Sequence, residues 1–346
     1  MLQLRSYSYD LAFEYPFTIS KGTKTHQPTL VVALGLGNMF GFGEAPAISY
    51  YNVTVPGMVE VLEAKRRDIE RYALIDPQRF WHFLHHLMPG ENFLTAALDI
   101  AGWDLFSQMR RKPLYQMLGL QFKQAPVTDY TIGIDTAEMM GEKIQKHPWP
   151  IYKIKIGTSD NIELLAALRK YTDAPFRIDA NEALTFDETK RLLPEFEKLG
   201  VQLLEQPMHR DAYEEMKELK QLSPIPLFAD ESCRTEGDVE KCIDSFHGIN
   251  IKLTKCSGIT PAIRMIDNAR KNGLKVMMGS MNESTIGTAA VAHMAPLLDE
   301  IDADGPLLLK EDIAEGLKYQ NGNVMINNLP GLGIRFRGEK FSSSKI

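Results

Sequence analysis

The chain lacks the features that mark several large classes of protein. Its 346 residues include only three cysteines, Cys233, Cys242 and Cys256, and no CxxC pair, so neither a disulfide framework nor a zinc finger is expected. No apolar stretch approaches the roughly 20 residues of a membrane span, and the start, MLQLRSYSYD, does not resemble a signal peptide. Positive charge is also scarce, because the formal net charge is −6. We therefore expect a cytoplasmic protein that binds neither nucleic acid nor a membrane.

The sequence does contain charged residues at a nearly constant spacing. Lys155, Asp179, Glu205, Asp230 and Lys252 follow one another at steps of 24, 26, 25 and 22 residues, and each closes a short β-like run. A step of roughly 25 residues is the length of one strand–helix unit in a (β/α)8 barrel, where the C-terminal ends of the strands meet at one mouth. The series therefore predicts an α/β barrel whose mouth carries three acids flanked by lysines.

Strand and helix patterns divide the chain into two parts. Residues 1–124 begin with strand-like segments and continue with helical patterns over 55–72, 77–87 and 93–111, which predicts an α+β capping domain, completed by about 310–346. Residues 125–309 alternate strands with helices, which predicts parallel βα units and the barrel. The eight candidate strands lie near 127–132, 151–156, 176–180, 201–205, 225–230, 249–253, 275–279 and 299–304.

The three spaced acids are candidate metal ligands. Each of Asp179, Glu205 and Asp230, taken alone, is explained as well by a helix cap or a loop acid. Together, at barrel spacing, they predict a set of carboxylate oxygens that suits a hard cation such as Mg²⁺. Asn181 has the strand parity of Asp179 and Glu231 adjoins Asp230, so both are candidates for the surroundings of the metal.

The lysines suggest acid–base chemistry. Lys153 and Lys155 share one face of their strand, although a solvated pair on an edge strand is the alternative. Lys252 closes the sixth strand, whereas Lys255 has the opposite parity and falls past the strand, so we favour Lys252. The second and sixth strands lie on opposite sides of a barrel, so Lys155 and Lys252 could exchange an α-proton on opposite faces of a substrate and invert its carbon. A second lysine and a cation nearby disfavour the charged form of Lys155.

The motifs together resemble those of the muconate-lactonizing branch of the enolase superfamily, and within it the dipeptide epimerases. The resemblance implies a (β/α)7β modified TIM barrel with Mg²⁺ bound to the three acids. It also implies proton exchange by Lys155 and Lys252 through an enediolate stabilised by the metal, with Lys153 tuning Lys155. Barrels of this branch often form homo-oligomers. The motifs are FGFGEA, ALDIAGWDLFSQMRRKPLYQMLG, YKIKIG, RIDAN, LLEQP, ADES, INIKLTKCSGI and PGLGI.

An Asp-x-Asp motif at the end of the eighth strand separates the epimerases from their relatives. Here it is Asp302 and Asp304 in IDADGP, and in the family these residues hold the ammonium of a dipeptide's N-terminal residue. N-acylamino acid racemases, o-succinylbenzoate synthases and cycloisomerases share the metal and lysines, but their substrates have no free ammonium. A barrel that binds Mg²⁺ or a ligand without catalysis would be expected to lack an acid or a lysine, and none is missing.

Specificity is expected to depend on a loop that covers the mouth, Phe17 to Pro28, and on Met281 in MGSMNES, a segment that resembles the dipeptide-lining region. Lys24 stands where family members acting on Ala-Glu usually place an arginine, and His26 is a further possible contact. Lysine attracts a carboxylate without bidentate geometry. These residues favour L-Ala-D/L-Glu as substrate, in the recycling of cell-wall peptides, with an uncharged dipeptide as the alternative.

Overall fold

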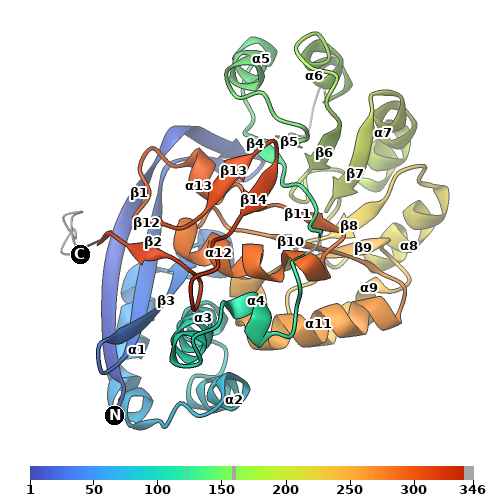
Figure 1. Cartoon of the computed structure of the whole chain (residues 1–346). Coiled ribbons are helices and arrows are strands. Elements are labelled where there is room, and N and C mark those ends of the chain that lie inside the picture. Colours follow the sequence, from blue (N-terminus) through green and yellow to red (C-terminus); the bar gives the residue numbers. More distant parts are fainter. Residues whose placement is uncertain (123, 158–160, 339–346) are drawn as a thin grey trace.

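The segment that follows Thr128 forms a closed barrel of parallel strands. The computed structural model describes residues 1–122, 124–157 and 161–338 (Figure 1). Eight strands pair in the order β11-β10-β9-β8-β7-β6-β5-β4, and a parallel bridge between Thr128 and Ile301 joins the two edges. The strands are β4 (Tyr130–Ile132), β5 (Tyr152–Lys155), β6 (Phe176–Asp179), β7 (Val201–Glu205), β8 (Leu227–Ala229), β9 (Gly248–Lys252), β10 (Lys275–Gly279) and β11 (Glu300–Ile301).

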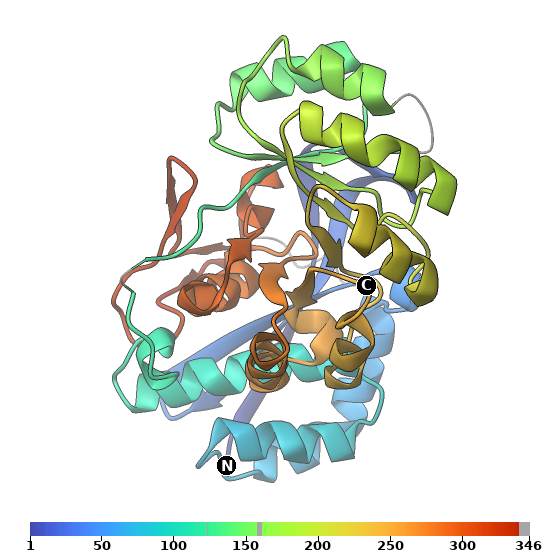
Figure 2. The ribbon, with the colours of Figure 1, turned by 90° about the vertical axis from the view of Figure 1, so that its right-hand side faces the viewer.

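Helices alternate with these strands and lie outside the barrel (Figures 1 and 2). One of them, α7, begins with a capping box, in which Thr185 and Glu188 each accept the other's backbone N–H. The alternation through β11 confirms the predicted (β/α)7β barrel. The helices are α5 (Ala137–Lys146), α6 (Asn161–Leu168), α7 (Phe186–Lys198), α8 (Tyr213–Leu222), α9 (Val239–Cys242), α10 (Leu253–Cys256), α11 (Ile259–Lys271), α12 (Thr285–Met294) and the short α13 (Gly305–Leu308).

The ends of the outer strands differ from the prediction. Strand β4 begins at Tyr130 rather than near 127, and β11 ends at Ile301 rather than near 304. Asp302 and Asp304 therefore lie in a turn after the eighth strand, because the chain leaves the sheet to start α13 at Gly305 and Pro306. Their placement depends on contacts made by the turn rather than on strand parity.

The N-terminal part forms an antiparallel sheet covered by helices. Strands β1 (Gln3–Ile19), β2 (Gly22–Leu36) and β3 (Met39–Pro46) pair in chain order. Helix α3 is buried along almost its whole length, against this sheet on one side and the barrel on another. Gly41 and Gly43 permit the close approach, because a Cβ on either would lie within 2.3 Å of a backbone atom of α3. The helices α1 (Val55–Arg71), α2 (Pro77–Leu87) and α3 (Asn92–Met109) are close to the predicted ranges, and a short helix that was not predicted follows, α4 (Leu114–Met117).

The C-terminal strands contact both parts. Strands β12 (Ala314–Glu315) and β15 (Arg335–Phe336) pair with each other, and the ring of Phe336 lies 4.9 Å from that of Phe42 in β3. Strands β13 (Lys318–Gln320) and β14 (Asn323–Met325) form a hairpin whose Gly322 carbonyl accepts the N–H of Thr128 at the barrel edge. The domain boundaries predicted from the sequence stay a prediction, and residues 339–346 lie outside the described residues. Within the described ranges, no helix is long and apolar enough to cross a membrane.

Buried polar contacts join the cap to the barrel. Asp99 of α3 accepts the backbone N–H and the hydroxyl of Thr260 at the start of α11, at 3.0 and 2.8 Å. Burial raises the pKa of Asp99 to about 7, although the hydrogen bonds from Thr260 act to lower it. Glu44 of β3 accepts the N–H and hydroxyl of Ser284 before α12. These carboxyls fix the cap over the barrel at the starts of two helices.

We expect Asp99→Ala to lower the free energy of unfolding by about 1–3 kcal/mol, because the buried donors of Thr260 lose their acceptor. Urea unfolding followed by circular dichroism measures the change. The control is Asp267→Ala, at an exposed carboxylate on α11, which should change stability by less than about 0.5 kcal/mol. Equal stabilities for the two variants would contradict the role of Asp99 in holding the cap on the barrel.

Candidate functional site

Several of the predicted residues line one cavity at the C-terminal ends of the barrel strands, namely Lys153, Lys155, Lys252, Asp230 and Asp302. Lysines and acids from the strand ends form its floor, and Met281 after β10 lies on one side. The tip of the β1–β2 hairpin forms the roof, so the predicted covering loop consists mainly of strand residues. Roof residues are Phe17, Ile19, Lys21, Lys24, Gln27 and, from the following segment, Tyr50.

Lys153 lies at the centre of the floor. Its ammonium contacts Asp179 at 3.2 Å, Glu205 at 2.9 Å and Asp302 at 2.8 Å, and only 2% of the residue is exposed. Burial disfavours the charged form, but the carboxylates outweigh it and raise the pKa of Lys153 well above its ordinary value. Lys153 therefore remains an ammonium that joins the predicted metal ligands to the Asp-x-Asp motif.

The other two lysines close their strands on opposite sides of the barrel. Lys155 is the last residue of β5 and contacts Asp179 at 2.5 Å, on the same carboxylate oxygen as Lys153. Lys252 is the last residue of β9 and contacts Asp230 at 2.8 Å. Strands β5 and β9 are separated by β6, β7 and β8, so the two ammonium groups approach the cavity from different sides.

Asp179, Glu205 and Asp230 end or follow β6, β7 and β8, and all three are almost completely buried. Burial opposes ionisation, but Lys155 and Lys153 lower the pKa of Asp179 to about 2, and Lys252 and Lys255 hold the pKa of Asp230 far below its ordinary range. Asn250 donates to Glu205 Oε1 at 2.8 Å. Oε2 has no aligned hydrogen-bond donor although Lys153 lies 2.9 Å away. Burial raises the pKa of Glu205. The two ionised aspartates, together with Oε2 of Glu205, are oxygen ligands of the kind that a hard cation takes.

The neighbours of these acids hold them in place. Asn181 donates to Glu231 at 3.2 Å and accepts from Lys155 at 3.2 Å, and a place for both Asn181 and Glu231 beside a metal stays a prediction. The sequence reading missed Gln206, whose amide oxygen accepts the N–H groups of Asp230 and Ser232, both at 3.0 Å. The sequence signal that could have identified Gln206 is its position in the LLEQP motif, directly after Glu205.

Lys255, the rejected candidate, has a different environment from Lys252. Its ammonium is fully buried and donates to Asp230 Oδ1 at 2.5 Å. It also donates to the backbone carbonyls of Asp230, Cys233 and Asn250. It lies in helix α10 rather than in β9. All its donors are directed at the β8 and β9 loops, so Lys255 supports Asp230 and faces away from the cavity.

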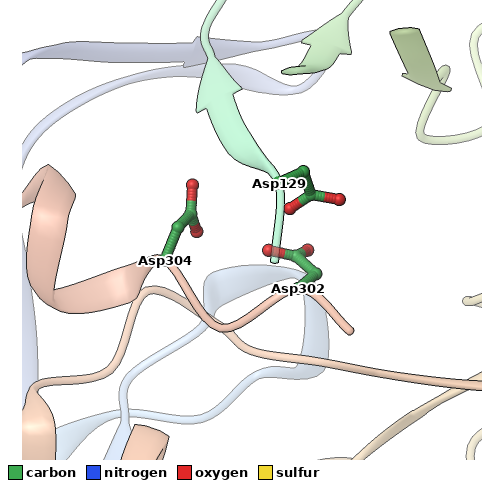
Figure 3. Close-up of side chains that lie close together, drawn as sticks. All are labelled: Asp129, Asp302 and Asp304. Atoms are coloured by element: carbon green, nitrogen blue, oxygen red, sulfur yellow. The ribbon is translucent and has the colours of Figure 1, made fainter. Parts of the chain in front are cut away.

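Asp302 and Asp304 form a cluster with a third acid that the sequence reading missed. One oxygen each of Asp129, Asp302 and Asp304 lies within 4.8 Å of the others, and all three side chains are buried. Figure 3 shows the carboxylates of Asp129 and Asp302 close together, with Asp304 to one side. Burial and the charge of Asp302 raise the pKa of Asp304 to about 8. Asp129 pairs with Arg177 at 2.8 Å.

The roof residues are held against the barrel loops. Lys21 at the hairpin tip contacts Glu182 at 2.5 Å and Glu231 at 3.5 Å. Lys24 lines the cavity, and among the described residues its hydrogen-bond partner is Gln27, at a long 3.4 Å. Burial lowers the pKa of Lys24. His26 is exposed, bonds to its neighbour Thr25 and does not line the cavity.

This arrangement of lysines and acids at a (β/α)7β mouth can be compared with known proteins. A family model described as enolase C-terminal domain-like matches residues 135–340. The chain belongs to the enolase C-terminal domain-like family. The L-Ala-D/L-amino acid epimerase of Flavobacterium johnsoniae is 47% identical over 94% of this chain and 97% of that protein. The L-Ala-D/L-amino acid epimerase of Maribacter sp. is 43% identical over 96% and 99%.

A solved structure of an enolase-family dipeptide epimerase shares the fold. The enzyme from Cytophaga hutchinsonii, complexed with Mg and the dipeptide D-Ala-L-Val, superposes with a TM-score of 0.91 at 26% identity. The match covers 99% of this chain and 96% of that chain. The resemblance to the enolase superfamily that the motifs indicated is thus confirmed over nearly the whole length of the chain.

We expect Lys255→Met to lower the free energy of unfolding by about 3–5 kcal/mol, because it leaves part of the Asp230 charge and three carbonyls without their donor. Chemical unfolding measures this loss. Lys271→Met, at an exposed lysine on α11, serves as the control and should behave like the unmodified chain. If Lys255→Met were as stable as the control, Lys255 would not have the supporting role assigned above.

Proposed function

We propose that this chain is a Mg²⁺-dependent epimerase that inverts the α-carbon of the C-terminal residue of dipeptides. The observation that carries the proposal is the placement of Lys155 and Lys252 at the ends of two strands separated by three others, on either side of one cavity. Its relatives named as L-Ala-D/L-amino acid epimerases support the substrate class. Lysine side chains on two faces of a substrate suit removal of a proton from one face and its return to the other.

The chain's own residues divide this work. Lys155 and Lys252 are the two groups that hold and transfer the α-proton, one for each enantiomer. Lys153 remains charged, because three carboxylates surround it, and its ammonium adds positive charge beside Lys155. Asp302 lines the same cavity, where it can bind the ammonium of the N-terminal residue. The hairpin roof keeps bulk water from the exchanging groups.

Asp179, Glu205 and Asp230 would hold the Mg²⁺ ion, with Asn181, Glu231 and Gln206 orienting them. When bound, the ion stabilises negative charge on the substrate carboxylate as the α-proton leaves. The fit rests on the ionised state of Asp179 and Asp230 and on the unsatisfied oxygen of Glu205.

The Asp-x-Asp motif favours dipeptides over N-acylated amino acids. Asp302 lines the cavity, and one oxygen each of Asp129, Asp302 and Asp304 lies within 4.8 Å of the others. An N-acylated amino acid offers no ammonium to these buried carboxyl groups, whereas the charged donor of a dipeptide forms a stronger hydrogen bond than a neutral one. A barrel without catalysis is also disfavoured, because Lys153, Lys155, Lys252 and Asp302 all line one cavity.

We propose a broad choice of C-terminal residue, with L-Ala-D/L-Glu as one substrate among several. Lys21 is already paired with two glutamates, whereas Lys24 has no acidic partner within the part of the chain that the structure describes. Apolar atoms of Ile19, Ile48 and Met281 also line the cavity. A cytoplasmic location, a homo-oligomeric assembly and a part in recycling cell-wall peptides are further proposals that rest on the family resemblance.

In Mg²⁺ and D₂O, we expect Lys252→Ala to slow epimerisation by about 10²- to 10⁴-fold, while exchange of the α-proton continues from one enantiomer without inversion. Lys155→Ala should show the same pattern with the other enantiomer. Proton NMR and chiral chromatography of L-Ala-L-Leu and L-Ala-D-Leu separate the two effects, and calorimetric titration checks that each variant still binds Mg²⁺.

The control for this pair is Lys190→Ala, at an exposed lysine on α7 paired with Glu218 at 3.3 Å, and its rate should equal that of the wild type. Epimerisation by Lys252→Ala at the wild-type rate would exclude the two-lysine mechanism. If neither variant exchanged the α-proton of either enantiomer, the two lysines would have to act together on each enantiomer rather than one on each.

A further inference from the structure

The turn that carries Asp302 and Asp304 receives little support from the sheet. Strand β11 consists of two residues, Glu300 and Ile301, which pair with β10. On its other side a single bridge to Thr128 closes the barrel. One oxygen each of Asp129, Asp302 and Asp304 lies within 4.8 Å of the others, so a weakly paired turn needs other contacts to hold these side chains at fixed positions.

The peptide unit between Ile301 and Asp302 is held from both sides. Its carbonyl oxygen accepts a hydrogen bond of 2.8 Å from Arg177 of β6, and its N–H donates to Met278 of β10 at 2.9 Å. Arg177 is only 1% exposed and uses the same nitrogen to bind Asp129 at 2.8 Å. The orientation of the Asp302 backbone therefore depends on a side chain that reaches across the barrel interior.

The following residue, Ala303, is held by two hydroxyl groups from distant segments. Its N–H donates to Thr128 Oγ1 at 2.8 Å, and its carbonyl accepts from the hydroxyl of Tyr319 in β13, also at 2.8 Å. The side chain of Asp304 then accepts the N–H of Thr131 in β4 at 2.5 Å. Each peptide group from Ile301 to Ala303 thus has a partner outside the turn.

We propose that Arg177, Thr128 and Tyr319 are positioning residues that set the affinity of this site for the ammonium of the dipeptide. They touch the backbone of the turn rather than the cavity, so they act through Asp302 and Asp304. The proposal rests on the proposed function. It gives the C-terminal β13–β14 hairpin a part in selecting substrates with a free amino group, although this hairpin carries neither the lysines nor the predicted metal ligands.

Tyr319→Phe tests the proposal, because it removes one hydroxyl and keeps the ring. The readout is the ratio between the inhibition constant of N-propionyl-L-leucine, which lacks the ammonium, and the KM of L-Ala-L-Leu. We expect the KM to rise about three- to ten-fold with kcat unchanged, as for the loss of one neutral hydrogen bond. The inhibition constant should stay the same, so the ratio falls by the same factor. Thr128→Val should act in the same direction.

The matched control is Tyr115→Phe. The hydroxyl of this buried residue also makes a hydrogen bond to the C-terminal segment, at 3.2 Å to the Asn328 side chain. Its ring contacts Phe122 and His293 rather than the residues that hold the turn, so the loss of this hydroxyl should leave the ratio unchanged. If the wild type is active and Tyr319→Phe has the same ratio, or if both constants rise equally in the variant, the positioning role is wrong and the proposed function stands. A wild type inactive toward every dipeptide would overturn the proposed function, and this proposal with it.

Discussion

The site depends on the pairing of buried charges at the mouth of the barrel. Lys153, Lys155, Lys252 and Lys255 each contact at least one buried carboxylate at 2.5–3.2 Å. Removing an ion from water costs on the order of several kcal/mol even after relaxation, so each of these groups is tolerated only because the others are present. The pairing also fixes positions, since a lysine held by a carboxylate on a strand end cannot leave the cavity.

The rest of the molecule keeps this network in place and covers it. Strand ends supply the lysines and acids, while Gln206 and Lys255 hold the loop that carries Asp230. The cap is attached to the barrel by buried carboxyls at two helix starts, and its hairpin tip reaches the mouth through Lys21 and Glu182.

The sequence allowed the barrel and the core of the site to be predicted because two regularities are local. The spacing near 25 residues and the parity of Lys153 and Lys155 follow from strand and helix geometry. Asp129, Arg177 and Gln206 were missed because their partners are distant in the chain. Asp302 and Asp304 were predicted to lie on a strand, but β11 ends at Ile301. The strand ends there because the chain turns to start α13, and the strand pattern gives no sign of that helix start. His26 was expected near the substrate, but the antiparallel hairpin leaves it exposed.

The most direct measurement is proton NMR of the wild-type chain in D₂O with Mg²⁺ and three compounds: L-Ala-L-Leu, L-Ala-L-Glu and N-acetyl-L-leucine. The account predicts loss of the α-proton signal of the C-terminal residue in both dipeptides, with the diastereomer appearing, and little change in the N-acetylated compound. Exchange confined to N-acetyl-L-leucine, or no exchange in any compound by protein that binds Mg²⁺, would contradict the account.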